Sequence, residues 1–195
     1  MTETTAIRAH PESAGRRLDN PKLGMWIFIA SEVMLFSALI GALLTAKLDS
    51  PPTANDVLNV PVTALNTFIL IVSSTTVVMA LSAAQDGAQR KLRGFLIATL
   101  LLGGTFLGIQ ITEYRILLSE GFTPAGSLFG SAFYTVTGLH GFHVFIGLCL
   151  LLWLIPQAFK GRFTPADYTR VEVFGLYWHF VDVVWIVLFT LIYLL

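Results

Sequence analysis

Five stretches of apolar residues constrain this sequence more than any other feature, because each is long enough to cross a membrane. They lie at residues 23–46, 61–84, 94–117, 128–156 and 173–195. At 1.5 Å per residue, about 20 such residues span the roughly 30 Å hydrocarbon core of a bilayer. Backbone amides cannot stay unbonded in lipid, so each stretch is predicted to be a helix. The sequence therefore predicts an all-α membrane protein, with a single bundle of five transmembrane helices over residues 23–195.

Composition agrees with this class and excludes others. Hydrophobic residues make up 55% of the chain and charged residues 12%, whereas soluble domains carry about 25% charged residues. The net charge of +0 gives no reason to expect a nucleic-acid partner. The single cysteine, Cys149, excludes a disulfide framework within the chain. Residues 1–22 are polar and lack the apolar core of a signal peptide, so they are predicted to form a polar cytoplasmic tail.

The distribution of Lys and Arg predicts the orientation in the membrane. Two of the 12 basic residues, Lys47 and Arg115, fall in the first and third loops. The remainder fall in the tail and in the second and fourth loops: Arg8, Arg16, Arg17, Lys22, Arg90, Lys91, Arg93, Lys160, Arg162 and Arg170. Because loops rich in Lys and Arg stay in the cytoplasm, the N-terminus is predicted to be cytoplasmic and the C-terminus outside.

Five ionisable side chains fall at similar depths in the inner half of this predicted membrane: Glu32, His140, His143, His179 and Asp182. The helical rise places them between about 8 and 13 Å from the inner surface. An ionisable group at such a depth costs several kcal/mol unless it is neutral or paired. The i, i+3 spacing within the last two helices puts each pair on one helix face. We therefore expect a buried polar network, which the hydroxyls of residues 73–76 approach.

Each of these residues has a functional and a structural interpretation. Glu32 could be a proton-buffering carboxyl or a neutral hydrogen-bonding group. His140 and His143 could bind a metal or haem, although histidines in such positions more often hydrogen-bond across helices. His179 and Asp182 could relay protons or could hold their helices together. The residues alone leave these alternatives open.

A second, weaker polar layer near the outer surface contains Asn66, Gln110 and Glu113. Glu113 is predicted to lie close enough to the surface to reach water. Aromatic anchors at the membrane surfaces are predicted at Trp26, Trp178 and Tyr193. Close helix packing is predicted at Gly104, Gly108, Gly138, Gly141 and Gly147.

The sequence has no complete metal-binding or catalytic motif. A di-iron bundle needs Glu-x-x-His pairs, but Leu35 and Ile116 lie three residues after Glu32 and Glu113. The HxxxH zinc spacing, the phosphate-binding loop and the nucleophile elbow are also absent. The chain is therefore predicted to bind no cofactor or metal itself. It also lacks the internal repeat that a stand-alone proton-coupled transporter would be expected to have.

Five segments resemble subunit III of the haem–copper respiratory oxidases. They are residues 24–36 (GMWIFIASEVMLF), 60–67 (VPVTALNT), 110–114 (QITEY), 130–144 (GSAFYTVTGLHGFHV) and 177–185 (YWHFVDVVW). The last two are the most specific, since chance would rarely place both in this order at this spacing. The resemblance covers the chain from about residue 23 to residue 195, and it identifies the chain as a member of this family.

The resemblance implies a role inside a larger enzyme in a bacterial plasma membrane. Subunit I of such an oxidase carries the haems and copper, and subunit II receives electrons. Subunit III packs on subunit I, holds phospholipid and supports proton uptake and sustained turnover; small or supercomplex subunits are further possible partners. By motif match, Glu32 takes the place of the family's buried glutamate, His143 that of its partner, and His179 with Asp182 that of the last-helix pair.

The chain departs from many family members in its helix number. Those members have seven helices with a lipid-filled cleft between the first two and the last five, whereas this chain resembles a shortened, five-helix bacterial form. A cytochrome c oxidase is the first interpretation, and Glu32 rather than Asp favours it slightly. A quinol oxidase and a purely structural lipid-binding scaffold remain the alternatives.

Overall fold

The computed structural model describes residues 20–48 and 60–194. They form five long helices: α1 (Asn20–Leu48), α2 (Val60–Gln85), α3 (Gln89–Ser119), α4 (Leu128–Phe159) and α5 (Thr169–Phe189). A short π-helical turn, η2 (Thr190–Leu194), continues α5. All five are long and apolar enough to cross a membrane, which confirms the predicted fold class. Residues 1–19 of the predicted tail lie outside the described part, and residues 20–22 belong to α1.

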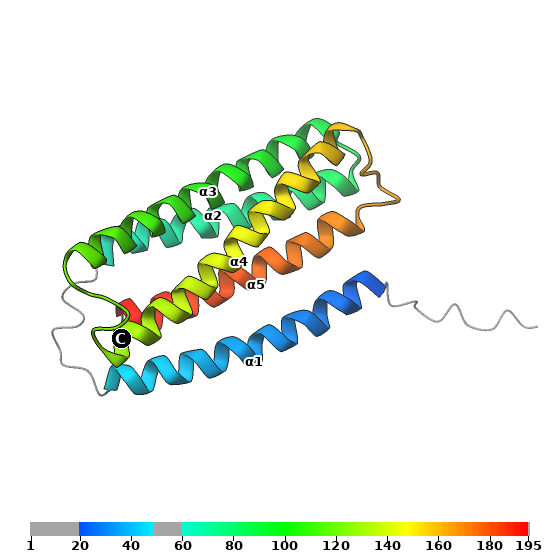
Figure 1. The fold of residues 1–195 in the computed structure, drawn as a ribbon. Helices are drawn as coiled ribbons and strands as arrows, with labels where there is room; N and C mark the ends of the chain where they lie inside the picture. The colour runs from blue at the N-terminus through cyan, green and yellow to red at the C-terminus, as the bar shows by residue number, and fades with distance from the viewer. Residues whose placement is uncertain (1–19, 49–59, 195) are drawn as a thin grey trace, which may run out of the picture.

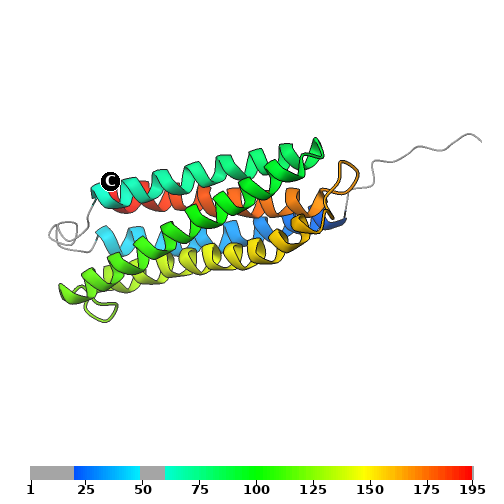
Figure 2. The same cartoon turned by 90° about the horizontal axis from the view of Figure 1, so that it is seen from above.

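The helices divide into a four-helix bundle and one attached helix. Helices α2, α3, α4 and α5 pack around a common core, and we call these four the bundle. Helix α1 packs against α4 and α5 (Figures 1 and 2). Short turns join α2 to α3, α3 to α4 and α4 to α5. Gly87, Gly121 and Gly161 end the preceding helices at positive φ, which glycine adopts without steric cost.

Trp178 fills the centre of the bundle, so its predicted place at a membrane surface is wrong. Its ring lies against the backbones of α3 and α4, where a Cβ on Gly103 or Gly147 would come within 2.8 or 2.5 Å of it. Its indole nitrogen donates to the Ser73 hydroxyl on α2 at 3.0 Å. A single side chain on α5 therefore contacts each of the other three bundle helices.

The glycines that allow close packing are only partly those expected. Gly147 packs as predicted, and Gly141 lies against Gln110 on α3. A Cβ on Gly104 or Gly108, in contrast, would meet no described atom within 4 Å, so this pair makes no close contact within the described chain. The small residue that α3 uses is Gly103, one position earlier.

Helix α1 presents one narrow face to the bundle. Its buried or half-buried apolar residues repeat at helical spacing: Met25, Ile29, Phe36, Leu39, Ile40 and Leu43. Large side chains on its other sides are exposed, including Met34 at 76% and Trp26 at 56%. The apolar contact of α1 with the bundle is therefore limited, and polar contacts add to it.

Candidate functional site

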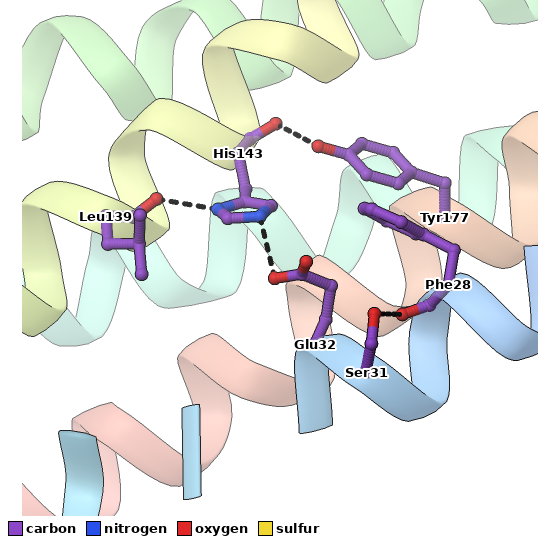
Figure 3. Close-up of polar contacts among 6 residues, drawn as sticks. All are labelled: Phe28, Ser31, Glu32, Leu139, His143 and Tyr177. Atoms are coloured by element: carbon purple, nitrogen blue, oxygen red, sulfur yellow. Dashed lines mark hydrogen bonds and ion pairs between the residues drawn. The ribbon is translucent and has the colours of Figure 1, made fainter. Parts of the chain in front are cut away.

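The predicted contact between Glu32 and His143 is present. Figure 3 shows Glu32 on α1 facing His143 on α4, with carboxyl Oε2 and ring Nε2 3.2 Å apart. Both side chains are largely buried, at 14% and 9% exposed. This contact joins α1 to the bundle inside the membrane-spanning part of both helices.

The second ring nitrogen of His143 constrains the protons of this pair. Nδ1 lies 2.8 Å from the carbonyl oxygen of Leu139. A carbonyl only accepts hydrogen bonds, so Nδ1 carries a proton. Nε2 and the Glu32 carboxyl then need one further proton between them, because otherwise a ring lone pair would face a carboxylate. The pair is an imidazolium with a carboxylate or a neutral imidazole with a carboxylic acid, and its net charge is zero in both states.

Neighbouring contacts fix the position of His143. The Tyr177 hydroxyl on α5 donates to the His143 carbonyl at 2.8 Å, as Figure 3 also shows. The ring of Phe36, one helical turn beyond Glu32, meets the imidazole edge-on at a centroid distance of 5.3 Å. Three helices thus hold the imidazole in place opposite the carboxyl.

His140 lies apart from this pair. Its side chain is fully buried between Phe106 and Trp185, and its Nε2 donates to the carbonyl of Val181 at 3.2 Å. No described residue accepts from or donates to its Nδ1. The geometry matches the cross-helix hydrogen bond that the sequence left open as one interpretation.

His179 and Asp182 form a separate cluster with Ser74 of α2. The Ser74 hydroxyl lies 2.6 Å from His179 Nδ1. The same hydroxyl is the polar group next to the Asp182 carboxyl, although neither carboxyl oxygen has a well-formed hydrogen bond within the described chain. Asp182 is only 4% exposed. The five predicted residues therefore form three separate sites, since no hydrogen bond or ion pair within the described chain joins one site to another.

The predicted outer layer is buried and closely bonded. Glu113 is only 8% exposed, so the expectation that it reaches water is wrong. One of its oxygens accepts from Thr63 at 2.8 Å and from Tyr193 at 3.1 Å, which joins α2, α3 and η2. Gln110 donates to the Thr137 carbonyl on α4 at 3.1 Å, and Asn66 of α2 donates to a carbonyl of α3 at 3.2 Å. These residues hold the outer half of the bundle together.

Two further polar contacts attach α1. Near its inner end, Lys22 lies 2.8 Å from Glu172 of α5. Near its outer end, Lys47 donates to the carbonyls of Leu191 and Ile192 at 3.0 and 3.1 Å. With Glu32–His143 they form three polar contacts along α1, which we call the inner, middle and outer clasps after the orientation that the sequence predicts. No sequence pattern pointed to the outer clasp, because its acceptors are backbone carbonyls at the end of the last helix.

The described residues contain no group of three or more His, Cys, Asp or Glu side chains that could hold a metal ion.

Comparison with known proteins identifies the family. Residues 2–195 match the family described as Cytochrome c oxidase subunit III. The chain is 35% identical to cytochrome c oxidase subunit 3 of Bacillus sp. (strain PS3), over 100% of this chain and 95% of that protein. It is 36% identical to cytochrome bo(3) ubiquinol oxidase subunit 3 of Pseudomonas aeruginosa, over 90% of this chain and 85% of that protein. It is 38% identical to the probable cytochrome c oxidase subunit 3 of Mycobacterium tuberculosis (strain ATCC 25618 / H37Rv), over 98% and 96%.

The chain belongs to the cytochrome c oxidase subunit III family.

Membership in the subunit III family confirms the resemblance found in the sequence motifs. Proteins of this family are subunits of haem–copper oxidases in aerobic respiration, so the chain is an integral membrane protein of a complex with other subunits. The motifs that carried the resemblance supply the middle clasp and, in His179 and Asp182, two of the three residues of the cluster with Ser74. Two of them, residues 24–36 and 130–144, meet at Glu32 and His143.

Proposed function

We propose that this chain is the non-catalytic subunit III of a proton-pumping cytochrome c oxidase. It packs on the haem- and copper-bearing subunit I, holds phospholipid, and supports proton uptake and sustained turnover. In this proposal the redox centres belong to the partner subunits, and the complex lies in a bacterial plasma membrane. The proposal rests on family membership and, for proton uptake, on the geometry of the Glu32–His143 pair.

The observation that supports the proton role is the approach of Glu32 Oε2 to His143 Nε2 at 3.2 Å, while Nδ1 of the same ring donates to the Leu139 carbonyl. A proton placed between Nε2 and the carboxyl keeps the pair neutral, which avoids the large cost of a net charge in lipid. In this proposal, a subunit with this pair near a proton entrance holds and passes protons during turnover.

The side from which protons arrive follows from orientation, which is part of the proposal. The inner clasp and Arg93, which donates to the Ala158 carbonyl at 3.1 Å, lie at the end of the bundle that the basic loops assign to the cytoplasm. Glu32 lies about 18 Å along α1 from Asn20, the first residue of that helix. A single cysteine at Arg90 or Lys91, in a Cys149→Ser background, should react with a membrane-impermeant reagent only after the cells are opened. Efficient labelling of intact cells would reverse the orientation.

A hollow on the surface of α3 supports the proposal that this chain holds phospholipid. The hollow, of about 500 Å³, runs along this helix. It is lined by Val62 of α2 and by Thr105, Gly108, Ile109, Thr112, Glu113, Ile116, Leu117 and Glu120 of α3 and its end. The apolar side chains and the missing Cβ of Gly108 leave room for an acyl chain beside the two carboxyls.

A quinol oxidase is the second candidate, and one observation favours it. The Pseudomonas aeruginosa relative is named a ubiquinol oxidase subunit, at an identity similar to that of the cytochrome c oxidase relatives. The cytochrome c oxidase relatives match more of this chain, at 96–100% against 89–90%, which supports the first candidate.

Purification of the complex through a tag on this chain tests the proposal. We expect a haem-bearing subunit I to co-purify and the complex to oxidise reduced cytochrome c. We also expect the complex lacking this chain to lose activity after fewer turnovers. Oxidation of ubiquinol but not cytochrome c would select the second candidate. Isolation of the chain without any haem protein would contradict both.

A further inference from the structure

The outer face of α2 and α5 has a polar atom at its centre that lipid cannot satisfy. Nδ1 of His179 is taken by Ser74, and its Nε2 makes no hydrogen bond to any described residue. Nε2 is not enclosed by the chain, and His179 is half-buried, so this nitrogen reaches the surface. His179 lies about 9 Å along α5 from residue 173, where the apolar stretch begins, which places it inside the hydrocarbon layer, in its inner half.

Apolar side chains surround this nitrogen. On α5, Val183 and Ile186 follow His179 on the same helix face and are 58% and 42% exposed. On α2, Ile71 and Val78 flank Ser74 and are 43% and 54% exposed. Two adjacent helices therefore present one largely apolar surface with the imidazole nitrogen near its centre, and we call it the α2–α5 face. The exposed hydroxyl of Thr75 on this face donates to the carbonyl of Ile71.

The His179 Nε2 atom limits which molecules can cover this face without leaving it unbonded. Acyl chains offer no hydrogen bond, and at about 9 Å inside the hydrocarbon layer the nitrogen lies beyond direct hydrogen-bond distance of the headgroups. A transmembrane helix with a hydrogen-bonding side chain at the same depth offers both the apolar surface and the partner for Nε2.

We propose that the α2–α5 face docks a transmembrane helix of the haem-bearing subunit I, which places a hydroxyl, amide or carboxyl side chain against His179 Nε2. The inference rests on the proposed role as a subunit that packs on subunit I. It adds which face of this chain makes the contact, at what depth in the membrane the contact lies, and which chemical groups meet there. Through Ser74, the same contact brings the partner's side chain close to the buried Asp182 carboxyl.

Photo-crosslinking in the assembled oxidase tests the face. Benzoylphenylalanine is placed at Val183 or Ile71 on the α2–α5 face, and at Leu101 of α3, which is 65% exposed, as a control. We expect irradiation to join this chain to subunit I from Val183 and Ile71, and to give little such product from Leu101.

Other products would overturn the inference. Adducts of subunit I from Leu101 but not from Val183 would reject this face while leaving the proposed function intact. Adducts from Val183 only to lipid or to a second copy of this chain would also reject it. If no residue around the bundle, tested in turn, gave an adduct with subunit I, both the inference and the proposed packing would fail.

Substitutions at the polar centre test the hydrogen bond. His179→Leu removes it, His179→Gln keeps a hydrogen-bonding group, and Ser74→Ala removes only the internal contact. We expect His179→Leu to lower the fraction of this chain that stays with purified oxidase by roughly threefold or more, as the loss of one interhelical hydrogen bond in a membrane allows. The Gln variant should recover much of that loss, and Ser74→Ala should cause little. An equal loss with Ser74→Ala would mean that His179 only joins α2 to α5.

Discussion

The bundle and α1 are both membrane-spanning, but they are held by different forces. In the most apolar 18 residues of α5, 56% are buried within the chain, against 11% in α1. The bundle is held by close backbone packing around Trp178, whereas α1 depends on three polar clasps. Since lipid tails are as apolar as the helix surface, apolar contact alone provides little attraction in a membrane. Polar clasps can therefore position a helix that packs poorly.

The two regions also use different polar contacts. In the bundle, hydroxyls, amides and the His140 imidazole bond to fixed partners across helices. In the middle clasp, a carboxyl and an imidazole face each other at 3.2 Å. The clasp that attaches α1 is thus also the contact to which we assign the proposed proton role.

The largest effect is expected from overpacking the bundle. Gly147→Ala would place a Cβ 2.5 Å from the Trp178 ring, so the ring must move. We expect a loss of about 1–3 kcal/mol in the free energy of unfolding, as for other overpacked interiors. Thermal aggregation of the purified complex measures it. Gly41→Ala on α1 is the matched control, since its Cβ meets no described atom within 4 Å. Equal effects of the two changes would remove the distinction between bundle and α1.

The outer clasp should be the strongest of the three. Lys47→Met keeps the length of the side chain but leaves two carbonyls without their donor. A buried hydrogen bond to a charged group contributes about 1.5–3 kcal/mol, and because Lys47 is only half-buried we expect its contribution to be smaller, about 1 kcal/mol. We expect the outer end of α1 to separate from the bundle without loss of the bundle itself. Spin labels at Thr45 and Thr112, in a Cys149→Ser background, should give a broader distance distribution. An unchanged distribution would mean that apolar packing suffices there.

The inner clasp should contribute least to stability. Lys22 and Glu172 are 32% and 26% exposed, and their ion pair lies close to the membrane surface. Exposed ion pairs contribute about 0–1 kcal/mol. Lys22→Gln should therefore change complex yield and thermal stability only slightly, and less at high salt, where the charge attraction is screened. A loss as large as that of Lys47→Met would show that both ends of α1 are held equally.

The sequence predicted the helices and the middle clasp for the same reason, which is the cost of polar groups in lipid. That cost also required Glu113 to have partners, but depth alone could not show that Thr63 and Tyr193 would cover it. Trp178 was misplaced because an aromatic residue near a helix end suits either a membrane surface or a packed core. Its true place depends on Gly103 and Gly147, which belong to other helices. Lys47 was missed because its partners are carbonyls, which every residue has.

Turnover of an assembled Glu32→Gln oxidase across pH tests the proton role most directly. The glutamine amide can donate to His143 Nε2, so it preserves the shape and neutrality of the middle clasp while it can no longer release a proton. We expect normal assembly and lower turnover, with the deficit widening at alkaline pH, where protons are scarce. Because the pair is not at the catalytic centre, the loss should stay well below the roughly 100-fold typical of removing a catalytic acid–base group. Unchanged turnover at every pH, in a fully assembled complex, would contradict the proton role and leave the middle clasp as a structural contact.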